Sequence, residues 1–408
     1  MDFSIPEGCL AVMERLAACG YPSYLVGGCV RDLCRGVEPH DYDLTTSASP
    51  DEMKTVFKDY RVIGTGIAHG TLTVLSDGAP YEVTTYRIDG DYSDGRHPDT
   101  VIFTPSLELD LARRDFTVNA MAYSPAEGLI DPFGGQADLD AKIIRAVGEP
   151  ERRFSEDSLR ILRALRFSST LGFAIEPATA AALRDLAPTV SRVSPERIRE
   201  ELLKLLSGGS SEGVLLTYRD ALVAAVPALA PIGESWNASA RAASKLSSDP
   251  VLALAALGRS LGEDGVSALF RTLKTDRRSE KRASLAVGAY VDGLPTDLSA
   301  AATFLIQYGA DTARDAILLA EAYGDKNAEA AKQAIDGFFK TGRPTTLAEL
   351  AVRGGDLTAI GIPEGPAMKE TLASLLDLAA KGKIAPIPAG KCCLMLMGIT
   401  MSRSSTAR

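Results

Sequence analysis

The sequence has few of the residues that build histidine-rich metal centres. Its 408 residues include only three histidines, His40, His69 and His97, and the C-terminal half has none. This scarcity excludes a histidine-rich metal phosphohydrolase domain. The sequence also has no apolar run that reaches the roughly 20 residues of a membrane-spanning helix. We therefore expect no membrane association.

Cysteine pairs with the spacing of a redox or zinc motif are also missing. The six cysteines show no CxxC spacing and no paired framework. Cysteines without such a framework are typical of a reducing compartment, so we expect a cytoplasmic protein. The first residues include acids and no basic segment, which indicates no signal peptide. We interpret Cys392 and Cys393 as buried small apolar residues.

Positive charge is in deficit along the whole chain. The formal net charge is −9 and the isoelectric point is near 5.1. By itself, this balance argues weakly against a nucleic-acid partner. Binding depends on local basic patches, however, so whole-chain charge does not decide the matter.

The pattern of secondary structure changes near residue 150. Before it, the stretches SYLVGG, DYDLTT, GTLTVL and YEVTTYR predict strands, because they are rich in Val, Thr, Tyr and Leu. After it, strand signals disappear and apolar residues recur at helical spacing. Ser49, Ser155 and Ser194 are predicted helix N-caps. The sequence thus predicts an α/β head followed by an all-helical remainder.

Two aspartates in HDYDLTT have the spacing of a metal site. Side chains alternate along a strand, so Asp41 and Asp43 are expected on one face. Neighbouring carboxylates repel each other unless a cation lies between them, and all-oxygen ligands favour Mg²⁺. Glu82, in the strand YEVTTYR, is the candidate for a third carboxylate. The alternatives are two solvated acids and an edge-strand glutamate that faces water.

A glycine pair precedes these aspartates. Gly27 and Gly28 let the backbone approach a phosphate, and the N–H groups of the helix that follows would point at it. Arg31 lies one turn into that helix and could bind phosphate. A tight turn without a ligand is the simpler alternative. The glycines, the arginine and the two aspartates together favour a nucleotide site.

Five segments in sequence order resemble one family. They are LVGGCVRD with DYDLTT, RRDFTVNAMAY (113–123), DPFGGQADL (131–139), EDSLRILRALRF (from Glu156) and PERIREELLKLL (195–206). They closely resemble the motifs of the class II nucleotidyltransferases of the polymerase-beta superfamily, which include bacterial CCA-adding enzymes and poly(A) polymerases.

The resemblance implies a polymerase-beta-like mixed sheet in the head, followed by an all-α neck, body and tail. It implies boundaries at residues 1–140 for the catalytic head, 141–206 for the neck, and 207–408 for a tRNA-binding body and tail. It also implies template-independent addition of CCA to a tRNA 3′ end from CTP and ATP, with Mg²⁺ at Asp41 and Asp43 and release of pyrophosphate. Gly27, Gly28 and Arg31 would lie at the triphosphate. Arg114, Asp115 and Asn119 would handle the ribose and phosphates.

The base-reading residues lie at helical spacing. Asp157, Arg160 and Arg163 recur every three residues, so they share one helix face. An Asp acceptor beside an Arg donor fits cytosine and adenine, which each offer an amino donor next to a ring-nitrogen acceptor. Guanine and uracil present the opposite pattern. We expect Asp157 and Arg160 to read the base. Arg163 is expected either to contact the triphosphate or to brace the helix, and a plain surface ion pair is the alternative for all three.

The resemblance leaves the product open among CCA, a single A and poly(A). Residues 87–101 resemble the flexible loop that full CCA-adding and A-adding enzymes carry, which disfavours CC addition alone. His97 stands where the family usually has arginine. Residues 354–384 resemble the tail of the shorter bacterial CCA-adding enzymes, although the usual closing Asn is absent. An A-adding enzyme and a poly(A) polymerase are the alternatives.

A local basic cluster offers a contact for RNA. Residues 271–282, RTLKTDRRSEKR, carry six basic and two acidic side chains, a net of +4. Such a cluster could follow an RNA backbone with salt-sensitive affinity. Arg277, Arg278 and Arg282 are the predicted tRNA-binding residues. A solvated helix face remains the alternative.

Overall fold

The computed structural model of the protein describes residues 3–64, 66–89 and 101–384. The chain divides into two compact units, residues 1–230 (unit 1) and 231–408 (unit 2). The predicted boundaries at residues 140 and 206 both lie within unit 1. The predicted division into head, neck and body stays a prediction.

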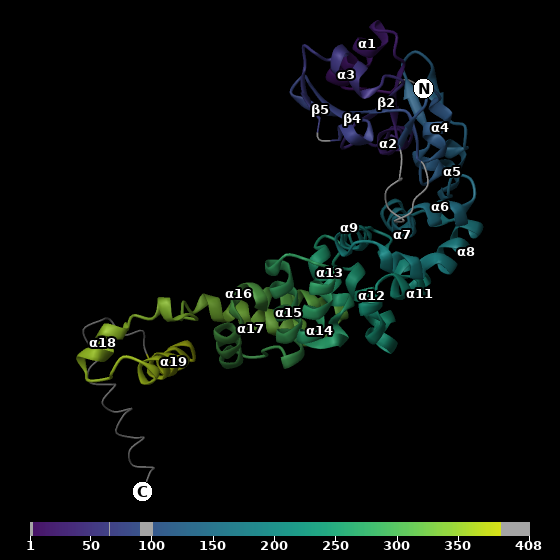
Figure 1. Ribbon diagram of the computed structural model, residues 1–408. Helices are drawn as coiled ribbons and strands as arrows, with labels where there is room; N and C mark the ends of the chain where they lie inside the picture. Colours follow the sequence, from purple (N-terminus) through teal and green to yellow (C-terminus); the bar gives the residue numbers. More distant parts are fainter. Residues whose placement is uncertain (1–2, 65, 90–100, 385–408) are drawn as a thin grey trace. The chain divides into compact units, whose positions relative to one another are not determined.

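A mixed seven-stranded sheet forms the centre of the N-terminal part of unit 1 (Figure 1). From edge to edge its strands are β3 (Arg61–Ile63), β4 (Thr71–Ser76), β5 (Ala79–Thr85), β2 (Asp43–Thr46), β1 (Ser23–Val26), β8 (Ala122–Ser124) and β9 (Gly128–Ile130). Strands β2 and β5 pair in parallel, and the other neighbours pair antiparallel. The four predicted strands are confirmed, although β2 begins only at Asp43.

Short helices accompany this sheet. They are α1 (Glu7–Ala18), α2 (Gly28–Cys34), α3 (Pro50–Val56), α4 (Leu107–Ala112) and α5 (Gly135–Ala141), with 3₁₀ turns η1 (Ile67–His69) and η2 (Thr117–Asn119). The N-cap predicted at Ser49 is confirmed. Its side chain accepts a hydrogen bond from the backbone N–H of Glu52, whose carboxylate accepts one from the N–H of Ser49.

In the sequence, a separate two-stranded ribbon lies between strand β5 and helix α4. Strand β6 (Arg87–Asp89) pairs antiparallel with β7 (Val101–Phe103). These strands frame the segment whose sequence resembles the flexible loop of the family. Residues 90–100, including His97, lie outside the described residues.

Helices make up the rest of unit 1. They are α6 (Pro150–Glu156), α7 (Leu159–Leu171), α8 (Pro177–Leu186), α9 (Pro195–Leu206), α10 (Ser211–Thr217) and α11 (Arg219–Ala225), with the 3₁₀ segment η3 (Ala187–Arg192). The expectation that strands end near residue 150 is wrong in one detail. β11 (Ala174–Ile175) pairs in parallel with β10 (Ile143–Ile144), because the chain after α7 returns to the edge of that short segment.

The predicted N-cap at Ser155 is also wrong. Ser155 lies in the last turn of α6, and its hydroxyl donates to the carbonyl of Glu151. The chain leaves the helix at Asp157, whose backbone is extended, and α7 begins at Leu159. The Asp157 carboxylate accepts from the Leu159 N–H, so the break serves Asp157 rather than Ser155. Ser194 is the N-cap of α9 as predicted, although its side chain makes no capping bond.

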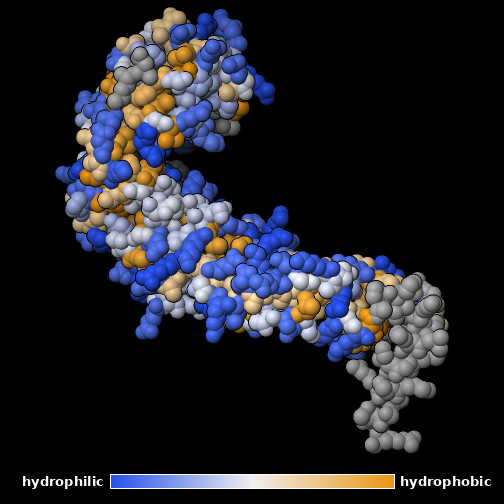
Figure 2. All heavy atoms as spheres, turned by 180° about the vertical axis from the view of Figure 1, so that it is seen from behind, coloured by the Kyte–Doolittle hydropathy of each residue, from blue (hydrophilic) through white to orange (hydrophobic). Residues whose placement is uncertain are grey.

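The described residues of unit 2 form helices joined by turns and loops, with no strand among them. Its helices are α12 (Trp236–Ser244), α13 (Pro250–Leu257), α14 (Gly262–Thr272), α15 (Arg277–Asp292), α16 (Leu298–Tyr323), α17 (Ala328–Lys340), α18 (Gly354–Ala359) and α19 (Pro366–Ala380), with 3₁₀ segments η5 (Arg259–Leu261) and η6 (Leu347–Glu349). The 3₁₀ segment η4 (Pro227–Ser235) begins in unit 1 and ends in unit 2. On the face of unit 2 shown in Figure 2, hydrophobic atoms form small, separate patches. Within the described chain, no helix has the length and apolar character to cross a membrane.

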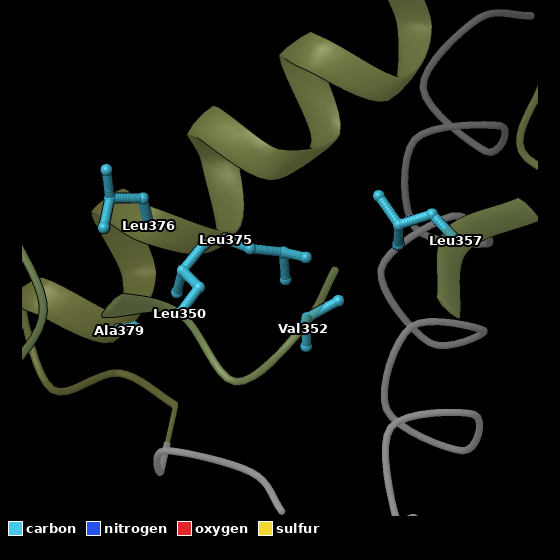
Figure 3. Packing of buried hydrophobic residues seen from close by; sticks show 6 residues of the cluster. All are labelled: Leu350, Val352, Leu357, Leu375, Leu376 and Ala379. Carbon is cyan, nitrogen blue, oxygen red and sulfur yellow. The ribbon is translucent and has the colours of Figure 1, made fainter. Parts of the chain in front are cut away.

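The tail segment has a small core of its own. Leu350 and Val352 pack with Leu375 and Leu376 of α19, and Figure 3 shows Leu350, Val352 and Leu375 side by side. Leu357 of α18 belongs to the same core. Cys392 and Cys393 lie outside the described residues, so their predicted burial stays a prediction. The predicted α/β head followed by helices is confirmed.

Candidate active site

The glycine turn joins the end of β1 to the start of α2. Gly27 has φ +77°, a backbone conformation that side chains disfavour. A Cβ atom on Gly27 would also lie 3.0 Å from Nη1 of Arg114. The positive φ is therefore the main reason for glycine at this position, and a Cβ atom would also force the Arg114 guanidinium to shift by a few tenths of an ångström.

The two predicted metal-binding aspartates lie next to this turn. Asp41 is exposed and precedes β2, while Asp43 opens β2 and is half-buried. In the parallel pairing of β2 with β5, Asp43 lies in register with Glu82, so the two side chains leave the same face of the sheet. Burial and the charges of Asp41 and Glu82 raise the pKa of Asp43 to about 6.

This acidic group fits a divalent cation. Its donors are carboxylate oxygens, and a bound cation would relieve the repulsion that raises the pKa of Asp43. Among the described residues, no set of three or more His, Cys, Asp or Glu side chains is arranged as a metal site. Metal binding by Asp41 and Asp43 stays a prediction, which rests on this pair of neighbouring carboxylates. The catalytic part predicted for exposed Glu82 stays a prediction.

A polar network extends from α2 to α7. Nη1 of Arg31 donates to the Asn119 side chain at 2.9 Å, and the amide of Asn119 donates to Asp115 at 3.1 Å. The second oxygen of Asp115 accepts from Nε of Arg163 at 2.8 Å. Burial alone would raise the pKa of Asp115, but Arg163 and Asn119 outweigh it and hold the pKa at about 2. Asp115 therefore stays charged and orients both neighbours.

Arg114 pairs with a buried acid, Asp110, that the sequence did not reveal. Asp110 is fully buried and accepts from Arg113 at 2.9 Å and from Arg114 at 3.4 Å. It also accepts from the backbone N–H of Arg87 at 3.2 Å, in the stem of the β6–β7 ribbon. An aspartate in a short helix carries no signal of burial in the sequence, because only the tertiary packing removes it from water.

The predicted base-reading residues do not share one helix face. Asp157 lies in the extended break between α6 and α7, whereas Arg160 and Arg163 lie in α7. One oxygen of Asp157 accepts from the Leu159 N–H at 3.0 Å, and the other accepts from Nη2 of Arg197 at 2.8 Å. Arg160 donates to the carbonyls of Arg153 and Arg113 and to Glu156. These three bonds leave two of the five N–H groups of a guanidinium. Both side chains therefore retain hydrogen-bonding capacity for a base.

One cavity of about 480 Å³ collects these side chains. The predicted residues that line it are Gly27, Gly28, Arg31, Asp41, Asp43, Arg114, Asp115, Asn119, Asp157, Arg160 and Arg163. Glu82 is the one head or neck site prediction that does not line it. The lining also includes Leu159, Arg166, Phe167 and Arg197, which were not predicted. Arg166 continues the three-residue spacing of Arg160 and Arg163, a signal that could have revealed it. Arg197 comes from α9, and no local pattern points to it.

The head and the following helices match two family models. Residues 23–145 match "Poly A polymerase head domain", and residues 172–230 match "Probable RNA and SrmB- binding site of polymerase A". The CCA-adding enzyme of Limosilactobacillus fermentum is 36% identical over 380 residues, 92% of each chain. The chain belongs to the family of CCA-adding enzymes. The resemblance drawn from the sequence motifs is confirmed.

Two further relatives support membership in the CCA-adding enzyme family. The CCA-adding enzyme of Geobacillus thermodenitrificans is 37% identical over 382 residues, which cover 92% of this chain and 93% of the relative. The solved structure of the Bacillus stearothermophilus CCA-adding enzyme in complex with CTP superposes with a TM-score of 0.82 at 32% identity, covering 98% of this chain and 99% of that one. Membership in this nucleotidyltransferase family implies the use of a divalent metal ion.

The predicted RNA-binding arginines lie in unit 2 at the start of α15. Arg277 and Arg278 are exposed. Arg282 is half-buried and bridges two carboxylates, Asp249 at 2.7 Å and Asp315 at 2.7 Å. These bonds indicate a structural role for Arg282. The RNA contacts of all three residues stay predictions.

Proposed function

We propose that the protein adds CCA to the 3′ end of tRNA from CTP and ATP without a nucleic-acid template, and releases pyrophosphate. One observation carries the proposal. A single cavity joins a glycine turn suited to phosphates, two carboxylates suited to a metal ion, and an Asp–Arg pair suited to a base. Family membership supports it independently.

Each part of the cavity has a task in this reaction. Asp41 and Asp43 would hold Mg²⁺, which when bound supplies charge neutralisation at the reacting phosphate and activates the attacking hydroxyl. Arg31 and Arg114 lie beside the glycine turn, where they would bind the triphosphate. Asn119 and Asp115 hold Arg31 and Arg163 through the bonds described above.

Selection of the base would belong to Asp157 and Arg160. A carboxylate oxygen has two lone pairs, so Asp157 can accept from the amino group of cytosine or adenine while it keeps its bonds to Leu159 and Arg197. Guanine and uracil would place a carbonyl oxygen against that carboxylate. The pair therefore favours CTP and ATP over GTP and UTP.

An extension assay tests the proposal. The protein is given Mg²⁺ and three labelled RNAs: a tRNA that lacks CCA, a tRNA that ends in CC, and an unstructured RNA. CTP and ATP are supplied separately and together. We expect extension that needs CTP first and stops after CCA. Addition of a single A, only to the tRNA that ends in CC, would indicate an A-adding enzyme. Long A tails on every RNA would indicate a poly(A) polymerase.

Two variants separate the parts of the site. Asp43→Asn should abolish extension while tRNA binding persists, because only the metal-binding carboxylate is changed. Asp157→Ala should lose the preference for CTP and ATP over GTP and UTP. Retained selectivity in Asp157→Ala would refute base reading by this residue.

A further inference from the structure

An aromatic ring lies among three arginines in the wall of the cavity. Phe167 belongs to α7 and is almost fully buried, with 6% of its surface exposed. The guanidinium carbon of Arg166 lies 4.0 Å from the ring centroid. Those of Arg31 and Arg163 lie at 5.4 and 5.5 Å. All four residues line the cavity.

The ring itself is fixed from behind. Phe116 is fully buried and meets Phe167 edge to face, with ring centroids 5.8 Å apart and planes at 81°. Such an arrangement is a favourable geometry for an aromatic pair. Phe167 therefore presents a rigid surface to the arginines.

The three guanidiniums carry like charges and repel one another: besides burial, the charges of Arg163 and Arg31 contribute to lowering the pKa of Arg166. Each also has an anionic neighbour: Arg31 pairs with Asp32 at 2.8 Å, Arg163 with Asp115 at 2.6 Å, and Arg166 with Glu201 at 2.6 Å. These carboxylates are spread over three parts of the chain. The Phe167 ring, by contrast, contacts all three arginines at once. The negative potential of an aromatic face attracts cations within about 6 Å of its centre.

We propose that Phe167 is a positioning residue that holds Arg31, Arg163 and Arg166 as one preorganised cluster for the phosphates of the incoming nucleotide. The inference rests on the proposed function, since it assumes a nucleoside triphosphate in this cavity. It goes beyond that function by assigning a role to Phe167 and Arg166. Preorganised donors lose little freedom on binding, so the ring contributes to phosphate affinity without touching the ligand.

This role has a consequence that a merely structural role lacks. The arginine cluster acts on phosphates, whereas Asp157 and Arg160 act on the base. Loss of the ring should weaken CTP, ATP and inorganic pyrophosphate by the same factor and leave the ratio of CTP to GTP affinity unchanged. Loss of Asp157 should change that ratio and spare pyrophosphate.

The test measures the dissociation constants of CTP, ATP, GTP and pyrophosphate by calorimetry. Phe167→Leu removes the ring but keeps an apolar side chain, and we expect CTP, ATP and pyrophosphate to bind about tenfold more weakly, equal to about 1.4 kcal/mol. Phe167→Tyr keeps the ring face and should bind within about threefold of the wild type. Phe167→Met takes the place of the leucine variant if that variant does not fold.

Phe57→Leu is the matched control. Phe57 is also fully buried in unit 1 and also meets a second ring edge to face, Tyr60 at 5.5 Å. It does not line the cavity, so its loss should leave every dissociation constant unchanged. Melting temperatures show whether the variants are folded.

The outcomes separate this inference from the proposed function. A wild-type protein that binds neither CTP nor ATP would overturn both. A wild-type protein that binds them, with Phe167→Leu equal to it within twofold, would overturn the role of Phe167 alone. That role would likewise be overturned if Phe167→Tyr bound as weakly as Phe167→Leu, or if Phe167→Leu changed the ratio of CTP to GTP affinity.

Discussion

Replacement of Asp110 by asparagine tests how much a buried ion pair contributes to unit 1. The Asp110 carboxylate is fully buried and is shared by Arg113 at 2.9 Å and Arg114 at 3.4 Å. Its hydroxyl and backbone donors are Thr45 and the N–H of Arg87. Asp110→Asn keeps the shape of the side chain but removes the carboxylate that Arg113 and Arg114 share.

The expected cost follows from burial. Removing one partner of a buried pair costs about 3–5 kcal/mol, because the other charge stays desolvated. Burial raises the pKa of Asp110, but Arg113 and Arg114 outweigh it and lower the pKa below its usual value. The stabilisation is therefore fully present at neutral pH. It is lost below about pH 4, as the pH falls from the unfolded-state pKa of an aspartate through the lower folded-state pKa of Asp110. At pH 7 we expect Asp110→Asn to lower the free energy of unfolding by about 3–5 kcal/mol.

A second pair offers a control with the same spacing and length. Lys54 and Asp51 are also three residues apart in a helix and also 2.9 Å apart, but their side chains are 51% and 90% exposed. Asp51→Asn should cost less than about 1 kcal/mol, since exposed pairs are solvated and screened. Urea unfolding followed by circular dichroism measures both variants. Trp236, the single tryptophan, lies in unit 2, so its fluorescence reports that unit. Equal losses for the two variants would refute the reasoning from burial.

Three further perturbations have defined outcomes. Arg282→Met should destabilise unit 2 by about 2 kcal/mol, because Asp249 and Asp315 lose their shared cation. Replacement of an exposed arginine, Arg278→Met, should cost under about 0.5 kcal/mol. Trp236 fluorescence in urea measures both variants, and equal costs would contradict the structural role of Arg282. Without divalent ions, Asp43→Asn should stabilise unit 1 by about 1–2 kcal/mol above pH 6 and by nothing near pH 4. The reason is that the pKa of Asp43 is raised to about 6 in the folded state, so its charged form destabilises the fold at higher pH. A difference in melting temperature that does not depend on pH would be the contrary result. Gly135→Ala should lower the free energy of unfolding by about 2–3 kcal/mol, since the new Cβ would lie 2.3 Å from the Thr117 carbonyl oxygen. Gly134→Ala should lower it by about 1 kcal/mol, because the new Cβ would meet no atom and only the positive φ opposes it. Calorimetry that gives the reverse order would contradict the packing.

Features that depend on neighbouring residues were predicted well. The capping box at Ser49 was confirmed because it needs only residues three positions apart. The glycine turn before α2 was confirmed because the positive φ of Gly27 is a local requirement. The four strands predicted from their β-branched and aromatic residues were also confirmed. Most residues of the cavity were predicted from short motifs of a few residues each, and the family resemblance indicated that these motifs belong to one site.

Features that depend on distant segments were missed. Arg197 contacts Asp157 across 40 positions, and the buried Asp110 meets the stem of a ribbon 23 positions away. The cluster of arginines around Phe167 draws on α2 as well as α7. Serine is a common N-cap residue, yet Ser155 lies inside α6, and the helix ends at Asp157 instead.

By itself, the sequence determined that a strand-rich head precedes a helical remainder, and it located the glycine turn and most of the charged residues that line the cavity. Local backbone preferences and short-range capping bonds act within a few residues, so they can be read from the sequence. Only the tertiary structure decided which charges are buried, which arginine holds which carboxylate, and that Glu82 stands beside Asp43 but outside the cavity. Those outcomes depend on packing and desolvation between segments far apart in the chain, for which residue spacing carries no signal.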